Sequence, residues 1–356
     1  MRIGNNSTIC PSFWQTADMK YRFSRVVVAV SSFVALGLTS QPVLASQGSD
    51  AVTAMVVVDD GSRNASPAYL WTVSSTSDSL RQIALRNGAV LHEINGLNNP
   101  QAIVSYQGTI WVANSSANTV IQFDAVTGNR LRELDSARYN FRSPSGLVIS
   151  GPYLWISNSG NNSMTQVFAV SGAFVRNVQG AQYSFSSPRS LAVSGANVWV
   201  ANLGGDSITQ INGVNGQFIR TVRGAATGLR SPYELVVNGA NLWATNRMAN
   251  SVTQIDTRTG QVIRVIRQAA QRFHFPQGIV VAGQSVFVTN SMGHTVTQFA
   301  LQSGNPVRVI SSPQFNFAYP RAMVVSGLYV YVANVNTGTI VKIRTVDGTY
   351  GGTLSN

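Results

Sequence analysis

The chain alternates short apolar segments with short polar ones, in the pattern of β-strands joined by tight turns. One stretch shows it well, with Gly146–Ser150, Tyr153–Asn158, Met164–Ala169 and Phe174–Val178 rich in valine, isoleucine and aromatic residues. Glycine, serine and asparagine separate these segments, as expected for turns. No helical periodicity competes with the strand pattern. The pattern therefore predicts an all-β chain built of four-stranded units.

The strand pattern repeats with a fixed period of 44 residues. Four columns of residues keep this spacing without slippage through six copies. They are a proline column (Pro100, Pro144, Pro188, Pro232, Pro276, Pro320), an asparagine column (Asn114, Asn158, Asn202, Asn246, Asn290, Asn334), a glycine column (Gly128, Gly172, Gly216, Gly260, Gly304, Gly348) and an aromatic column (Trp111, Trp155, Trp199, Trp243, Phe287, Tyr331).

A seventh, degenerate copy precedes the six regular ones. Its Trp71, Ser74, Ser75, Gln82 and Gly88 match Trp111, Asn114, Ser115, Gln122 and Gly128, with Val56-Val57-Val58 as the opening strand and an insertion near Arg63–Pro67. A period of about 40–50 residues with four strands per unit is typical of a β-propeller blade. We therefore predict a seven-bladed β-propeller with four antiparallel strands per blade, closed by packing between its first and last blades.

The repeated segments also carry a family resemblance. Val198-Trp-Val-Ala-Asn202 and Val286-Phe-Val-Thr-Asn290, each followed by a Thr-Gln strand and a glycine turn, resemble the YVTN family of β-propeller repeats and are similar to NHL-type repeats. The resemblance covers residues 51–356 and implies the propeller fold. It implies little about activity, because such propellers serve as surface proteins, binding modules and occasional enzymes.

The N-terminus is predicted to be a secretory leader. Basic residues after Met19 precede an apolar run from Val26 to Leu38, and Val43-Leu44-Ala45 has the small-x-small pattern of a cleavage site. We expect residues 1–45 to be removed, translation to begin at Met19, and residues 46–356 to form the propeller. The exported protein would then be secreted, periplasmic or at the cell surface, with no transmembrane span.

Composition narrows the choice of partner. The chain of 356 residues has 25 Lys+Arg, 13 Asp+Glu and a formal charge of +12, which becomes +9 without the leader. Its single cysteine, Cys10, excludes a disulfide scaffold. The positive charge favours an anionic partner. Nucleic acid is not expected, because the protein is predicted to be exported and lacks a basic-aromatic platform.

The repeated columns have structural explanations. We expect the tryptophans to pack between sheets, the asparagines to satisfy turn amides in a left-handed conformation, and a connector column of Phe141, Phe185, Leu229, Phe273 and Phe317 to plug the blade interfaces. One arginine per blade recurs on the outermost strand (Arg132, Arg176, Arg220, Arg264, Arg308). These arginines either form a positive belt that binds an anionic polymer of the envelope, or each packs the aliphatic part of its side chain on the neighbouring blade and keeps its guanidinium in water.

Function is expected where the repeat varies, at the mouth of the central channel. The residues after the periodic prolines include Arg189, Tyr233, Gln277 and Arg321. The next position is small everywhere except at Glu234, and the loop after the asparagine column carries Arg247, Asp206, Met248 and Met292. Because arginine pairs well with carboxylate and phosphate, we predict an anionic or polar ligand bound by Arg189, Arg247 and Arg321, with Tyr233 stacking. The alternative is that Glu234 neutralises Arg189 or Arg247.

Catalytic patterns are scarce in the sequence. The three histidines have no metal-ligand spacing, Asp59-Asp60 is the one adjacent acidic pair, and no cofactor motif is present. Streptogramin-type lyases share the propeller shape, and His294 with Glu234 is the pair that could serve as their acid and base. The sequence has Pro276-Gln277-Gly278 in place of the recurrent Pro-His-Gly of those lyases. A non-catalytic binding or scaffold module is therefore favoured, with an anionic or polar ligand, an envelope component or a protein as its partner. The alternatives are a structural cell-surface protein and a metal-dependent lyase of the streptogramin-lyase type.

Overall fold

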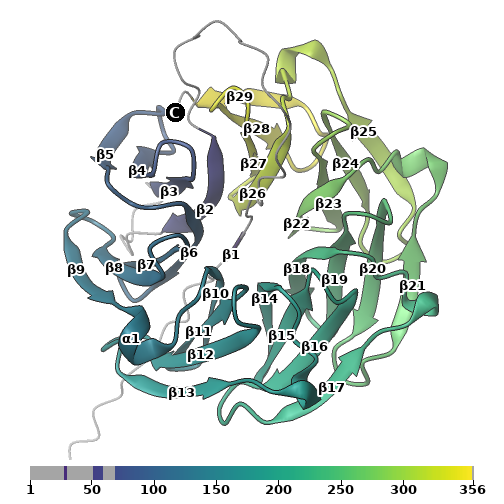
Figure 1. Ribbon diagram of the computed structural model, residues 1–356. Coiled ribbons are helices and arrows are strands. Elements are labelled where there is room, and N and C mark those ends of the chain that lie inside the picture. Colours follow the sequence, from purple (N-terminus) through teal and green to yellow (C-terminus); the bar gives the residue numbers. More distant parts are fainter. Residues whose placement is uncertain (1–27, 30–50, 59–68, 355–356) are drawn as a thin grey trace, which may run out of the picture.

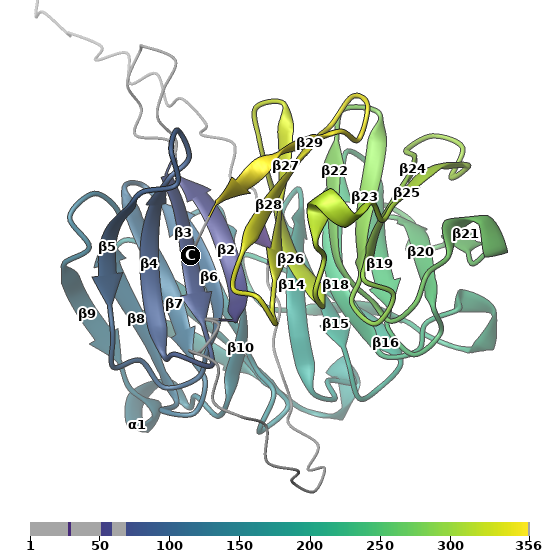
Figure 2. The ribbon, with the colours of Figure 1, turned by 90° about the horizontal axis from the view of Figure 1, so that it is seen from above.

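The fold is a closed ring of seven sheets, each a blade of four strands, and the first sheet has in addition the two-residue strand β1 (Val28–Ala29) at its inner edge. The computed structural model describes residues 28–29, 51–58 and 69–354. Figure 1 shows the ring seen along its axis, with β2, β6, β10, β14, β18, β22 and β26 innermost, and Figure 2 shows it turned by 90°. Neighbouring inner strands contact one another around the whole circle, including β2 with β26. The seven-bladed propeller is thus confirmed.

Each blade is a meander whose strands run in chain order from the axis to the rim. Blades 1 to 3 contain β2 (Val52–Val58), β3 (Tyr69–Ser74), β4 (Ser79–Ala84), β5 (Val90–Ile94); β6 (Pro100–Tyr106), β7 (Thr109–Asn114), β8 (Thr119–Asp124), β9 (Arg130–Leu134); and β10 (Pro144–Ser150), β11 (Tyr153–Asn158), β12 (Ser163–Phe168), β13 (Phe174–Val178).

Blades 4 to 7 repeat this order. They contain β14 (Pro188–Ser194), β15 (Asn197–Asn202), β16 (Ser207–Asn212), β17 (Phe218–Val222); β18 (Pro232–Asn238), β19 (Asn241–Asn246), β20 (Ser251–Asp256), β21 (Val262–Ile266); β22 (Pro276–Ala282), β23 (Ser285–Asn290), β24 (Thr295–Ala300), β25 (Pro306–Ile310); and β26 (Pro320–Ser326), β27 (Tyr329–Asn334), β28 (Ile340–Arg344), β29 (Tyr350–Leu354).

No strand is exchanged between the first and last blades. Both are formed by a continuous stretch of chain, so the ring closes by packing alone. Short helical turns lie in five of the connectors that lead from an outer strand to the next inner strand: α1 (Ser136–Tyr139), η1 (Ala181–Tyr183), η2 (Ala225–Thr227), η3 (Ala269–Gln271) and η4 (Pro313–Phe315). Among the described residues, no helix has the length and apolar character needed to cross a membrane.

Part of the expected leader lies inside the ring. The two-residue strand β1 (Val28–Ala29) pairs antiparallel with Val56 and Met55 of β2, and it also contacts β6, β22 and β26. Most of the predicted leader, the cysteine at position 10 and the acidic pair at positions 59 and 60 lie outside the described residues. Cleavage after residue 45 remains a prediction, and it would remove β1 from the inner strands.

Tryptophan packing joins neighbouring blades, as expected from its column. Trp71, Trp111 and Trp155 are fully buried, and each indole nitrogen donates a hydrogen bond to a backbone carbonyl of the next blade. The connector column is also buried or nearly so, with Phe141 and Leu229 inside the clusters between blades. Large apolar side chains therefore fill the wedge between sheets, which supplies most of the burial that holds the ring together.

The asparagine column does end each second strand, but it differs from the expectation in its backbone conformation. Asn202 stays in the strand, and its amide donates hydrogen bonds to the hydroxyls of Ser207 and Thr209. The left-handed residue comes four positions later, as at Asn162 with φ of 54°. Its side-chain oxygen accepts a hydrogen bond from the backbone N–H of Ser187, in the connector to the next blade.

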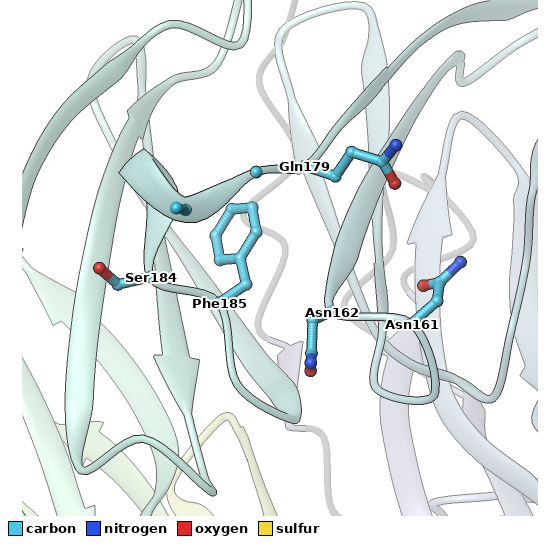
Figure 3. Close-up of a pocket in the computed structure, with 7 residues that line it drawn as sticks. Asn161, Asn162, Gln179, Ser184 and Phe185 are labelled. Carbon is cyan, nitrogen blue, oxygen red and sulfur yellow. The ribbon is translucent and has the colours of Figure 1, made fainter.

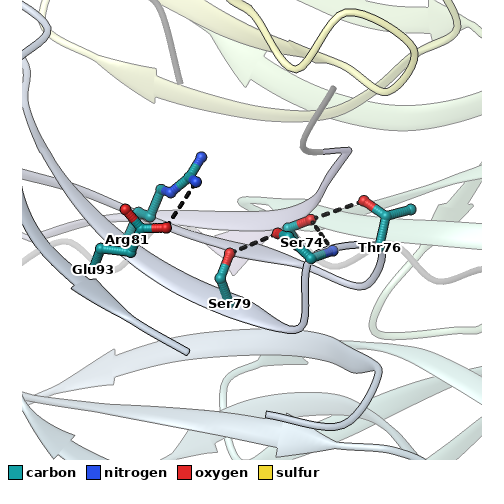
Figure 4. A network of polar contacts seen from close by, with 6 residues as sticks. Ser74, Thr76, Ser79, Arg81 and Glu93 are labelled. Carbon is teal, nitrogen blue, oxygen red and sulfur yellow. Dashed lines mark hydrogen bonds and ion pairs between the residues drawn. The ribbon is translucent and has the colours of Figure 1, made fainter. Parts of the chain in front are cut away.

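The first blade holds the corresponding turn with hydroxyl groups. Ser74 stands where the other blades have asparagine, and its hydroxyl lies 3.1 Å from the hydroxyl of Thr76. Ser77 and Ser79 form a second hydroxyl pair at 2.8 Å. Farther out on the same blade, Arg81 and Glu93 form an ion pair at 2.8 Å (Figure 4). The degenerate copy thus replaces the asparagine amide by a set of shorter hydrogen-bonding side chains.

The rim arginines clasp neighbouring blades. Arg220 donates a hydrogen bond to the backbone carbonyl of Thr259, and its stem lies against Gly260 of the next blade. The other blades repeat this contact in Arg132 to Ser171, Arg176 to Asn215 and Arg264 to Gln302. The glycine column itself is explained by the backbone, because Gly260 and its counterparts have a positive φ, 74° at Gly260, which disfavours other residues. These contacts support the structural interpretation of the arginine column over a free positive belt.

Replacing Arg220 by alanine is expected to lower the free energy of unfolding by about 1 kcal/mol, because it removes one charge-assisted hydrogen bond and the packing of the stem. Denaturant unfolding followed by tryptophan fluorescence measures the change. Arg223→Ala is the matched control, since Arg223 is exposed on the same rim. Equal destabilisation by the two variants would contradict the clasp.

Candidate functional site

One face of the ring carries every variable position singled out in the sequence. The first residue of each inner strand pairs with the last residue of the second strand, as Pro188 does with Asn202. The connectors and the loops after the asparagine column therefore meet at this face, around the channel mouth. The residues after the six periodic prolines, with Thr53 after Val52 in blade 1, form a ring of seven buried residues: Thr53, Gln101, Ser145, Arg189, Tyr233, Gln277 and Arg321.

The backbone of this ring is fixed by hydroxyl groups from the preceding blade. Ser157 donates to the carbonyl of Arg189 at 2.8 Å, and Thr289 donates to the carbonyl of Arg321 at 2.9 Å. Thr245 does the same for Gln277 at 2.7 Å. Blades 3 and 6 also place glycine beside these contacts, at positions 146 and 278. The backbone of each arginine of the ring is thus fixed in the same way, by a glycine and a hydroxyl-bearing residue of the preceding blade.

Three arginines converge on Tyr233. The guanidinium carbon of Arg189 lies 3.9 Å from the centre of the Tyr233 ring, and that of Arg247 lies 5.4 Å from it. Arg321 donates a hydrogen bond to the phenolic oxygen. Tyr233 is 1% exposed, so its ring supports the arginines and is not itself offered to a ligand. This differs from the stacking role expected from the sequence.

The arginine cluster concentrates positive charge in a buried place. Burial, helped by the charges of Arg321 and Arg247 and opposed by Tyr233, lowers the pKa of Arg189 to about 10. Burial alone would raise the pKa of Tyr233, but the fields of Arg189, Arg321 and Arg247 outweigh it and leave that pKa below its ordinary value. The site therefore favours negative charge at the phenolic oxygen.

Glu234 is the carboxylate that the sequence analysis placed beside this cluster. It is 1% exposed, and its backbone N–H donates to the hydroxyl of Thr245 at 3.1 Å. Its charge acts on Arg321, whose pKa is lowered by burial and partly restored by Tyr233 and Glu234. The expected neutralisation of Arg189 or Arg247 is not what the electrostatics favour. Three guanidiniums and one carboxylate leave an excess of positive charge among these four residues.

Arg247 and Gln277 complete the predicted set. Arg247 comes from the loop after β19, and its guanidinium carbon lies 4.0 Å from the centre of the Phe275 ring. Burial lowers its pKa, with Arg321 adding to the effect. The amide of Gln277 donates to the hydroxyl of Ser291 at 3.1 Å. The structure thus brings Arg189, Tyr233, Arg247 and Arg321 together, with Glu234 acting on one of them.

His294 and Asp206 belong to the left-handed loop column and not to the cluster. The Nδ1 atom of His294 accepts a hydrogen bond from the backbone N–H of Tyr319 at 3.2 Å, and the two rings meet edge to face at 4.8 Å. Asp206 accepts in the same way from Ser231. Within the described ranges, no group of three or more His, Cys, Asp or Glu residues lies together in a way that could hold a metal ion.

A polar pocket of about 400 Å³ opens beside Arg189, over blades 2 to 4. Most of its lining residues carry a hydroxyl or amide group, while Arg189 is charged and Leu203 is apolar. The hydroxyl and amide residues are Asn99, Gln101, Ser115, Ser116, Ser143, Ser145, Ser159 and Ser187. The variable positions after the prolines already included Gln101 and Ser145. The interpretation from sequence missed Ser115, Ser143, Ser159 and Ser187, because small polar residues in loops resemble ordinary turn residues. These four serines lie at the same positions of the repeat as Arg247 and Phe275.

The pocket loops are held in place by repeated backbone bonds. Ser115 donates to the carbonyl of Asn99, Ser159 to that of Ser143, and Leu203 to that of Ser187, at 3.1–3.2 Å. In blade 5 the same loop position is Arg247, a large side chain that turns toward Tyr233. The pocket therefore ends where the arginine cluster begins, and Arg189 belongs to both.

A second hollow of about 370 Å³ lies between the loop of blade 3 and the following connector (Figure 3). It is lined by Asn161, Asn162, Gln179, Gly180, Ala181, Ser184 and Phe185. Figure 3 shows the two asparagines on the loop and Phe185 beneath the connector. The lining contains no charged side chain, so it offers an anion less than the pocket beside Arg189.

Solved structures show which proteins share this fold. A catalytically inactive virginiamycin B lyase from Staphylococcus aureus with quinupristin superposes with a TM-score of 0.67 at 17% identity, over 84% of this chain and 97% of that one. Hydrazine synthase from Kuenenia stuttgartiensis gives 0.69 at 16% identity, over 87% and 100%. A functionally unknown protein from Desulfotomaculum acetoxidans gives 0.64 at 13% identity, over 81% and 95%.

These likenesses show the propeller fold. No protein-family model matches the chain, and no curated protein matches it. The sequence identities are too low to transfer an activity.

Tyr233 is expected to ionise at a lower pH than an ordinary tyrosine, because the neighbouring guanidiniums lower the pKa of its phenol. Anion affinity should fall as pH rises through this pKa, since the phenolate cancels one of the positive charges available to the ligand. Arg189, with a pKa of about 10, would lose its charge only at higher alkalinity. Ultraviolet titration of tyrosinate, paired with binding measured over the same pH range, tests both statements.

Tyr233→Phe is the control for this titration. The variant should lack the tyrosinate absorbance that appears below the ordinary pKa of tyrosine, and its anion affinity should change less with pH over the range in which Tyr233 ionises. Arg189, Arg247 and Arg321, which act on the phenol, and Glu234, which acts on Arg321, remain in the variant. A fall in affinity that persists in Tyr233→Phe would therefore show that another group is responsible.

Proposed function

We propose that the protein is a non-catalytic binding module for a small anionic or polar ligand, held at the channel mouth by Arg189 and Arg247. The single observation that supports this proposal is the convergence of three arginines on one buried tyrosine beside a polar pocket. Arg189 and Arg247 contact the ligand. Arg321 is more deeply buried. Its positive charge adds to the local electrostatic potential, and it forms a hydrogen bond with the phenol of Tyr233.

Electrostatics favours an anion at this place. Burying three guanidiniums together costs free energy, because each loses hydration and repels the others. A negatively charged ligand would offset that cost and form charge-assisted hydrogen bonds. Buried groups with shifted pKa values, such as Arg189, Tyr233 and Arg321, are more common at binding and catalytic sites than in ordinary packing.

The lyase alternative has less support in this chain. The likeness to virginiamycin B lyase is a likeness of fold, and quinupristin is the compound bound to that protein. His294, the base that such a lyase would need here, already accepts a hydrogen bond from Tyr319 in a turn position that asparagine fills in other blades. The loop column therefore explains His294 without a catalytic role.

The proposed function is tested by titrating the purified protein with small anions (acetate, phosphate, sulfate) and with neutral analogues such as acetamide. Anions should raise the melting temperature and neutral analogues should not. Arg247→Gln should weaken the anion effect about tenfold, the loss of one charge-assisted hydrogen bond. Equal effects of anions and neutral analogues, or an unchanged response in Arg247→Gln, would contradict the proposal.

We also propose that the protein acts outside the cytoplasm, as a YVTN/NHL-type propeller whose partner belongs to the cell envelope or its surroundings. The proposal is supported by the leader pattern in residues 19–45 and by the repeat motifs. N-terminal sequencing of the exported protein should find Ser46 first. A mature chain that still contains residues 28–29 would contradict cleavage at that point.

A further inference from the structure

The pocket beside Arg189 has a composition that narrows the ligand. Most of its lining residues carry a hydroxyl or amide group, and Arg189 is its one charged side chain. Serine hydroxyls both donate and accept hydrogen bonds, and side-chain amides offer the two functions side by side. A wall of this kind is matched by a ligand that also carries several hydroxyl groups.

We propose that this pocket binds a polyhydroxylated carboxylate, that is, a sugar acid either free or as a uronic acid unit of a glycan. The proposal rests on the function proposed above and names the ligand class for the same site. The carboxylate would lie against Arg189, and the ring hydroxyls against the serines of blades 2 to 4. Leu203 would contact the less polar edge of the ring.

Size and charge agree with this assignment. A volume of about 400 Å³ is at the small end of ligand pockets, which run from about 300 to 1,000 Å³, and suits one or two sugar rings. The single guanidinium in the pocket wall matches the single negative charge of a carboxylate. A polyphosphate would need more positive charge than the pocket wall provides.

The wall is also prearranged for recognition. The backbone bonds from Ser115, Ser159 and Leu203 to the neighbouring connectors fix the loops. Among the described residues, none forms a hydrogen bond with the side-chain hydroxyls of Ser143 and Ser187. Both serines line the pocket and are half-buried, so their hydroxyls are available to a ligand. Sites that hydrogen-bond ligand hydroxyls discriminate strongly against analogues that lack them.

The experiment compares three probes by calorimetry on the purified protein. They are galacturonate, galactose, which lacks the charge, and cyclohexanecarboxylate, which lacks the hydroxyls. Galacturonate should bind at least about thirtyfold more tightly than galactose and about tenfold more tightly than cyclohexanecarboxylate, given the strength of charge-assisted and neutral hydrogen bonds. Equal affinity for galacturonate and cyclohexanecarboxylate would overturn the inference.

A matched pair of variants places the ligand in this pocket. Leu203→Asp adds a negative charge to the wall, and Leu203→Asn adds the same shape without the charge. Leu203 is half-buried, so both variants should fold. The aspartate should weaken galacturonate binding about tenfold relative to the asparagine, as expected for a nearby like charge. Identical affinities in the two variants would show that galacturonate does not lie here.

The outcomes separate this inference from the function on which it rests. If acetate, phosphate and sulfate bind and depend on Arg247 while the sugar acid has no advantage, the ligand class is wrong and anion binding stands. If no anion binds in either experiment, both proposals fail.

Discussion

Gly278→Ala is expected to lower the free energy of unfolding by about 3 kcal/mol, at the upper end of the usual cost of overpacking. A β-carbon built on Gly278 would lie 2.1 Å from the backbone carbonyl oxygen of Arg321 in the next blade. No rotamer change relieves a collision with backbone, so the two inner strands must separate. Chemical denaturation measures the loss.

The same substitution should also disturb the site. The carbonyl of Arg321 accepts a hydrogen bond from Thr289, so separating the strands would loosen this bond and shift Arg321 away from Tyr233. We therefore expect weaker anion binding in Gly278→Ala even where the protein is still folded. Thr289→Val, which removes the hydroxyl and leaves the glycine, should reproduce part of that loss.

Gly283→Ala is the matched control in the same blade. Gly283 has φ of 57°, and a β-carbon there would have no atom within 4 Å, so alanine costs only about 1 kcal/mol of backbone strain. The difference between the two variants isolates the collision with the next blade. Similar destabilisation at both positions would mean that backbone freedom alone explains Gly278.

The sequence predicted the fold because the same local solution is repeated seven times. Each tryptophan, turn glycine and loop residue recurs at a fixed phase, so one blade's pattern could be checked against the others. The rim arginines were harder to interpret. Their partners are backbone carbonyls of the next blade, and a carbonyl leaves no mark in the sequence.

The site was only partly predictable, for a related reason. Variation within a constant column pointed to Arg189, Tyr233 and Arg321, and the structure brings these residues together. The contacts of Tyr233 with Arg189 and of Glu234 with Arg321 depend on how side chains from different blades meet at the channel mouth. Spacing along the chain does not contain that information.

At the left-handed loop position that His294 shares with Asn118 and Asn162, the sequence contained enough information to exclude a special role. His294 drew attention because histidine is a common catalytic residue, yet Asn118, Asn162 and Asn250 occupy the same place in other blades with similar φ values. Alignment of the repeats already contains this comparison. A rare residue type in a structural column is best judged by what its column does.

Arg189→Met is expected to weaken anion binding about thirtyfold while leaving the free energy of unfolding unchanged or about 1 kcal/mol higher. The binding loss follows from the removal of the guanidinium that lines the pocket. The effect on stability follows from burial, which lowers the pKa of Arg189 to about 10, and from the like charges of Arg321 and Arg247. Methionine fills a similar volume without those penalties.

Arg220→Met provides the opposite pattern. Arg220 bonds to the carbonyl of Thr259 on the rim, far from the channel mouth in its blade, so its loss should lower stability and leave anion affinity as it was. Calorimetric binding and denaturant unfolding on the two variants give four values that test the assignment together. If Arg189→Met destabilises the protein and keeps its affinity for anions, Arg189 is a packing residue and the cluster is not a binding site.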